Sequence, residues 1–183
     1  MLLALSLERL ISCALPGAEL QISAVALPGI RATTVDPIDP FPTESANSAY
    51  ARLRTGTDEA RALRWDGQLD SFGPWLEGQT QSIEDSLRRL AELRTGRADQ
   101  YGVASGRVAL TYEHIATALD RASGLANDAD MQAEWDALGP VLWERAQRFW
   151  ERCAKLTAAG APHLDAWEMR CTNAAEAALR APA

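Results

Sequence analysis

The stretch RADQYGVASGRVALTYEHIATALDRAS, residues 97–123, carries the clearest structural signal in the chain. Its apolar residues recur at intervals of three and four, which is the period of one face of an α-helix. These positions are Tyr101, Ala104, Val108, Tyr112, Ile115, Leu119 and Ala122. Gly102 and Gly106 lie in the same stretch and would let a neighbouring helix approach closely, because glycine has no Cβ. We therefore expect a long helix that packs at the centre of an all-α fold.

The chain on both sides of this stretch has a similar helical pattern. Further helices are expected over about residues 43–64, 74–94, 128–156 and 162–179. Breaks are expected at Trp65-Asp66-Gly67 and at Gly73-Pro74. Pro140 should bend the fourth helix or mark an early boundary, since a proline inside a helix costs roughly 3 kcal/mol. Together these segments predict an antiparallel helical bundle of four to five helices.

The N-terminal part has a different composition. We expect residues 1–43 to form an N-terminal segment and extended arm, and residues 44–183 to form the helical bundle with a C-terminal helical hairpin. The prolines of the arm are Pro16, Pro28, Pro37, Pro40 and Pro42. Residues before proline avoid the helical region, so we expect an irregular arm with one short strand or hairpin near residues 20–25.

Composition and charge exclude some classes of function. The chain has 183 residues, is 47% hydrophobic and carries a net charge of −7, which argues against a nucleic-acid binder. No apolar run approaches the roughly 18–20 residues that a membrane span needs. Leu10-Ile11-Ser12-Cys13 reads like a lipobox, in which Cys13 would be lipidated, but no basic region precedes it. A short amphipathic helix is the other interpretation of this segment.

Two cysteines stand symmetrically about an expected turn. Cys153 and Cys171 each lie nine residues from Pro162, so antiparallel helices on either side would place both sulfurs at the same height. This geometry predicts a disulfide, which needs Cα atoms about 4.4–6.8 Å apart. Two small buried apolar side chains are the alternative interpretation. A persistent disulfide is typical of proteins outside a reducing cytosol.

Four tryptophans are candidates for contact with a partner. Trp135, Trp143 and Trp150 recur at intervals of eight and seven on one side of the fourth helix, and Trp167 faces them across the hairpin. They either fill the core of the bundle or form an aromatic stripe that binds another helix.

Residues for catalysis or metal binding are sparse. The two histidines, His114 and His163, lie in no HxxxH or HxxE arrangement, and the three cysteines lack the paired spacing of a zinc site. No nucleophile elbow or glycine-rich phosphate loop is present. We predict no catalytic, cofactor-binding or metal-binding residues. A small helical enzyme that uses His114 is the least favoured alternative.

One motif indicates a family. Trp65-Asp66-Gly67 followed by Phe72 gives the pattern W-x-G-x-x-x-x-F, which resembles the WXG100 (ESX-type) proteins over about residues 44–123. The resemblance implies a helical hairpin with the motif at its turn, in a small acidic, often dimeric substrate of type VII secretion. The chain departs from the family at Gly73-Pro74 and has no Y-x-x-x-[DE] sequence after Tyr50, Tyr101 or Tyr112. Apart from the family, the motif predicts that Trp65 and Phe72 hold the connection in the core and that Gly67 allows a tight turn.

These observations favour a non-enzymatic exported protein, in the medium or the cell envelope, that binds a protein partner through helical surfaces. A type VII secretion substrate is one form of this function, and a homodimer is one form of the partnership. The alternatives are a cytoplasmic regulatory or immunity-type bundle and an envelope lipoprotein adaptor.

Overall fold

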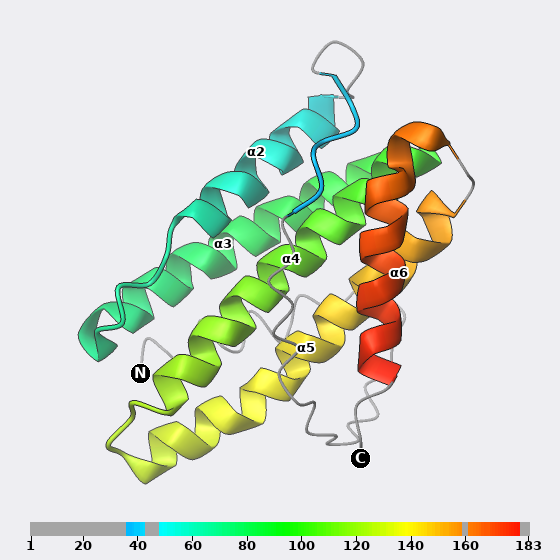
Figure 1. The fold of residues 1–183 in the computed structure, drawn as a ribbon. Coiled ribbons are helices and arrows are strands. Elements are labelled where there is room, and N and C mark those ends of the chain that lie inside the picture. The colour runs from blue at the N-terminus through cyan, green and yellow to red at the C-terminus, as the bar shows by residue number, and fades with distance from the viewer. Residues whose placement is uncertain (1–35, 43–47, 159–160, 180–183) are drawn as a thin grey trace.

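The computed structural model describes residues 36–42, 48–158 and 161–179. These residues form an all-α antiparallel bundle, as the sequence predicted (Figure 1). Its α-helices are α2 (Ser48–Ala62), α3 (Leu69–Leu93), α4 (Ala98–Ser123), α5 (Ala129–Thr157) and α6 (Asp165–Leu179). A short 3-10 turn, η1 (Pro162–Leu164), leads into α6. No helix among these residues is long and apolar enough to cross a membrane.

Helix α4 is the central element, and it contacts α2, α3, α5 and α6. Every residue from 102 to 112 is buried, so neighbours cover the helix on all sides. The close approach predicted at the two glycines is confirmed. A Cβ added at Gly102 would lie 2.9 Å from Leu156 Cβ, and one added at Gly106 would lie 2.8 Å from Trp167 Cζ3. Both glycines are therefore sites where α4 meets the C-terminal hairpin.

The break expected at Gly73-Pro74 is wrong. Helix α3 begins at Leu69 and continues through Pro74, which lies near the start of the helix. A proline there removes only one early helical hydrogen bond, whereas burial of Phe72 against Trp65 holds the first turn in the core. The local cost of proline is thus offset by tertiary packing.

Pro140 does not end α5, which runs unbroken from Ala129 to Thr157. Trp135 and Leu142 are buried on either side of this proline. The start of α5 follows its sequence signal, since the side chain of Asp128 accepts hydrogen bonds from the backbone N–H groups of Asp130 and Met131.

Residues 36–42 form an extended segment that packs on the bundle, which we call the docked segment (Figure 1). Its three prolines account for the lack of regular structure, and Phe41 is buried. The strand expected near residues 20–25, the first residues of the expected helix over 43–64 and the lipobox with Cys13 lie outside the described residues.

Candidate functional site

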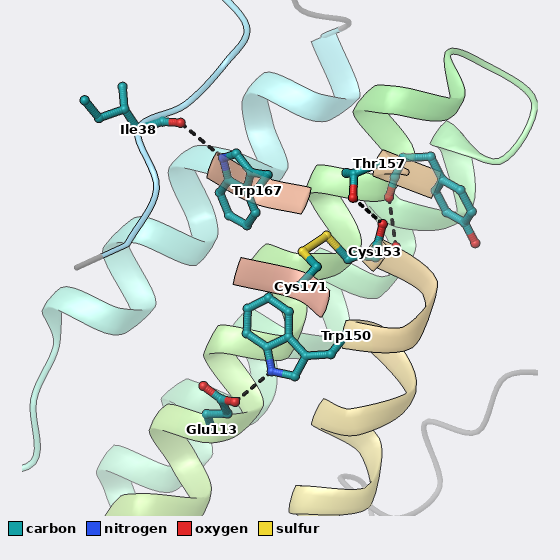
Figure 2. The surroundings of a disulfide bond; sticks show 9 residues. Ile38, Glu113, Trp150, Cys153, Thr157, Trp167 and Cys171 are labelled. Carbon is teal, nitrogen blue, oxygen red and sulfur yellow. Dashed lines mark hydrogen bonds between the residues drawn. A yellow bond between two sulfur atoms is a disulfide. The ribbon is translucent and has the colours of Figure 1, made fainter. Parts of the chain in front are cut away.

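Helices α5 and α6 are joined by the predicted disulfide, shown in Figure 2. Cys153 and Cys171 are bonded, with their Cα atoms 5.7 Å apart, and both side chains are fully buried. The other face of the bond meets α4, because a Cβ added at Gly106 would lie 3.0 Å from the Sγ of Cys153. The disulfide therefore lies inside the fold, at the contact of three helices.

Two buried tryptophans flank the disulfide, and each indole N–H has a specific acceptor (Figure 2). Trp150 Nε1 donates to Glu113 Oε1 at 2.7 Å. Trp167 Nε1 donates to the backbone carbonyl of Ile38 at 3.1 Å, and so links α6 to the docked segment. The hairpin of α5 and α6, which the disulfide joins, thus positions Trp167, and Trp167 binds the docked segment.

The four tryptophans do not form an exposed stripe. Trp135 and Trp150 on α5 and Trp167 on α6 are buried, because α5 packs against both α4 and α6. Trp135 packs on Phe72 with ring centroids 5.0 Å apart. Trp143 alone is partly exposed. The structure therefore places three of these four side chains where a partner cannot reach them without a change in the fold.

The docked segment is held chiefly through Asp39. One carboxylate oxygen accepts a hydrogen bond from Arg107 at 2.8 Å and another from the hydroxyl of Tyr50 at 3.0 Å. Arg54 lies 3.6 Å from the same oxygen. The other oxygen accepts the backbone N–H of Phe41 at 2.8 Å, which fixes the turn of the segment. Asp39 therefore joins the segment to both α2 and α4.

Phe41 provides the apolar part of the same contact. Its ring centroid lies 5.1 Å from that of Tyr50 and 5.8 Å from that of His163, both in edge-to-face orientation. The guanidinium of Arg97 lies 5.4 Å from the Phe41 ring centroid. We call the bundle residues that receive the segment the arm-binding surface, which consists of Tyr50, Arg54, Arg97, Arg107, His163 and Trp167.

Arg107 is the buried charge at the centre of this surface, with 6% of the residue exposed. It donates to Asp39 and, at 2.7 Å, to Asp58, and its guanidinium lies 5.6 Å from the ring centroid of Trp167. Burial also raises the pKa of Tyr50 above its usual range, so its hydroxyl stays a hydrogen-bond donor. Removing one partner of a buried charge typically costs about 3–5 kcal/mol. The docked segment therefore supplies one of the two acids that neutralise Arg107, and Asp58 of α2 supplies the other.

The sequence prediction missed Arg107 and Asp39. The sequence did single out Arg107, because it is the only charged residue between Asp99 and Glu113 in the most apolar helix. A charge that is buried on all sides needs an acidic partner. Its two acidic partners, Asp58 and Asp39, lie 49 and 68 positions earlier in the chain, and no local pattern identifies either.

A second polar cluster lies beside the disulfide. Glu113 accepts from Trp150 and forms an ion pair with Arg170 at 3.3 Å, and the guanidinium of Arg170 lies 4.8 Å from the Trp150 ring centroid. Burial raises the pKa of Glu113 above its usual range, although the Trp150 hydrogen bond and Arg170 both oppose this shift. This cluster fixes α6 against α4.

The turn motif has the structural role that its residues predicted. Trp65 and Phe72 are buried with ring centroids 5.0 Å apart, and Trp65 Nε1 donates to the carbonyl of Gln68 at 2.8 Å. Gly67 has a φ of +88°, a conformation that favours glycine. The motif therefore closes the connection between α2 and α3.

Both histidines contact neighbouring elements of the fold. His114 Nε2 lies 3.4 Å from the carbonyl of Leu63, and its ring contacts Trp75 edge to face. Burial lowers the pKa of His114. His163 lies beside Phe41, with Nε2 3.9 Å from a carboxylate oxygen of Asp99. In residues 36–42, 48–158 and 161–179, no three or more His, Cys, Asp or Glu side chains are grouped so as to hold a metal ion.

The chain matches no protein-family model, no curated protein and no solved structure. Its candidate site is therefore defined by geometry alone: an arm-binding surface, positioned by a disulfide hairpin and built around a buried arginine.

Proposed function

We propose that this chain is an exported, non-enzymatic helical protein that acts by binding a protein partner. The observation that carries the proposal is the buried disulfide between Cys153 and Cys171. Disulfides persist in oxidising compartments, whereas cytosolic thiols are kept reduced. Both cysteines are fully buried where the α5–α6 hairpin meets α4, so a reductant in solution does not reach the bond directly. A buried disulfide of this kind supports export.

Binding of a protein partner is supported by the arm-binding surface. Side chains from three helices already recognise an extended backbone there, through a main-chain hydrogen bond, a buried ion pair and an aromatic contact. The hairpin of α2 and α3, closed at Trp65 and Gly67, supports the version of the proposal in which the protein is a type VII secretion substrate.

The test is an intact mass, measured without reductant, on protein recovered from the medium, the envelope and the cytosol of its native host. Export predicts protein in the first two fractions, with a mass lower by two hydrogens and a peptide map that joins Cys153 to Cys171. The same measurement reads the state of Cys13, so a lipid there would identify an envelope-anchored adaptor. Protein found only in the cytosol, with three alkylatable thiols, would contradict export and favour a cytoplasmic regulatory bundle.

A further inference from the structure

Helix α6 is a short element that the docked segment helps to hold in place. It has 15 residues, a length at which a helix depends on tertiary packing for its stability. It packs chiefly against α5 and only slightly against α4. The docked segment crosses α4 between α2 and α6 (Figure 1), and its Phe41 ring contacts His163 in the turn that leads into α6. The segment therefore adds an attachment for α6 that the helix packing does not supply.

Trp167 of α6 is the residue that the docked segment restrains most closely. Its indole N–H donates to the carbonyl of Ile38 at 3.1 Å. Its ring centroid lies 5.6 Å from the guanidinium of Arg107, and Asp39 of the docked segment accepts a hydrogen bond from that guanidinium at 2.8 Å. The segment thus holds Trp167 both directly and through Arg107.

Trp167 also covers the disulfide. Cys171 follows it by four residues on α6, so the two side chains share one face of the helix. A Cβ added at Gly106 would lie 2.8 Å from Cζ3 of Trp167 and 3.0 Å from Sγ of Cys153, so the indole and the sulfur meet at one point of α4 (Figure 2). Both cysteines are fully buried, so their reduction requires the fold to open. Withdrawal of Trp167 from Gly106 would remove one of the groups that cover the bond.

We propose that the docked segment is a strap that holds α6 closed over the Cys153–Cys171 disulfide, and that release of this strap exposes the bond to a dithiol reductant without unfolding of the whole bundle. The inference goes beyond the proposed function, because it concerns how the folded chain protects its disulfide and not where the chain is found.

The reduction itself is thiol–disulfide exchange. One thiolate of the dithiol attacks a sulfur of the bond, the S–S bond breaks and a mixed disulfide forms. The second thiolate of the dithiol then displaces the cysteine that is still bound. The dithiol gives up two electrons and two protons and becomes a cyclic disulfide, while Cys153 and Cys171 become thiols.

The first experiment tests whether α6 opens separately from the rest of the bundle. Purified, oxidised full-length protein is treated with excess dithiothreitol in a series of urea concentrations below the unfolding transition. Alkylation stops the reaction, and peptide mapping gives the reduced fraction of Cys153 and Cys171. A local opening exposes less surface than global unfolding, so its rate depends less steeply on urea. We expect a reduction rate that is nearly independent of urea at low concentration.

The second experiment weakens the strap. Asp39→Asn removes the charge that pairs with Arg107, and Phe41→Ala removes the contact with His163. Each variant loses a buried contact of the strap, so reduction in low urea should be about tenfold faster or more. Ile38→Ala is the matched control, because this side chain is 90% exposed and the backbone carbonyl is the group that binds Trp167. It should be reduced at the wild-type rate.

A further control separates the strap from general stability. Ile83→Val removes a methyl group from the core on α3, which packs against α2 and α4, and so destabilises the whole bundle. It should leave the reduction rate in low urea unchanged.

Three results would each overturn the proposal. The first is a wild-type rate whose urea dependence equals that of global unfolding throughout. The second is a strap variant that is folded by circular dichroism and reduced at the wild-type rate. The third is equal acceleration by Ile83→Val and the strap variants. If Asp39→Asn does not fold, Phe41→Ala serves for the comparison, and the urea series on the unaltered chain decides the point if neither variant folds.

Discussion

Replacement of Gly106 by alanine tests the contact between α4 and the disulfide hairpin. The added Cβ would lie 2.8 Å from Trp167 Cζ3 and 3.0 Å from Cys153 Sγ, both closer than real Cβ contacts normally allow. Neither neighbour is a flexible chain end, because the indole is buried and hydrogen-bonded and the sulfur is in a disulfide. We therefore expect a destabilised protein.

The magnitude follows from two opposing effects. Alanine gains about 1 kcal/mol over glycine inside a helix. Overpacking of a tight core costs typically 1–3 kcal/mol, and two rigid neighbours place this site at about 2–3 kcal/mol. The free energy of unfolding should therefore fall by about 1–2 kcal/mol.

The matched control is Gly78→Ala on α3, where an added Cβ meets nothing within 4 Å. This variant has only the helix-propensity gain, so its free energy of unfolding should rise by up to about 1 kcal/mol. Urea unfolding followed by far-ultraviolet circular dichroism measures both variants. Equal stabilisation by the two substitutions would refute the described seating of the hairpin on α4.

Three further outcomes are expected from urea unfolding. The double variant Cys153→Ala, Cys171→Ala should lose about 3 kcal/mol of unfolding free energy in the chain-entropy model, because the bond joins residues 18 apart. Gly67→Ala should cost about 1–2 kcal/mol, because φ at this position is +88°. Glu113→Gln should flatten the dependence of stability on pH. Burial raises the pKa of Glu113 above its ordinary value of 4.5, so the folded state holds the proton more tightly than the unfolded chain does. Wild-type stability should therefore fall as the pH rises from 4.5 through the raised pKa.

Each of these has a result that contradicts it. Unchanged stability after loss of both cysteines would mean that packing alone holds α6. If Gly67→Ala leaves the free energy of unfolding unchanged, Gly67 does not adopt the left-handed conformation in the folded protein. A stability curve of Glu113→Gln that keeps the wild-type slope between pH 4.5 and neutrality would show that Glu113 titrates as it does in the unfolded chain.

Local patterns predicted much of the fold. Helix α4 begins within one residue of its expected start and ends where expected, because seven apolar positions share one helical face and glycine follows its last turn. The disulfide pair was predictable because two regular helices joined by a short turn bring equidistant residues together. The break expected at Gly73-Pro74 is absent, because burial of Phe72 outweighs a local preference.

The candidate site was less predictable. The spacing of Trp135, Trp143 and Trp150 indicated one side of α5 but did not say whether that side faces solvent or the core. The ion pair of Arg107 with Asp39 depends on where an extended segment crosses the bundle. No periodicity encodes that crossing, since the segment has no regular structure and its contacts are distant along the chain.

The sequence by itself determined the helices apart from the start of α3, the direction of the C-terminal hairpin and the pairing of Cys153 with Cys171, since these depend on interactions between near neighbours in the chain. Only the tertiary structure decided which tryptophans are buried and which acids neutralise Arg107. Those outcomes depend on how faces from distant segments meet, and the free energy of a buried charge or ring is set by all the neighbours that exclude water from it.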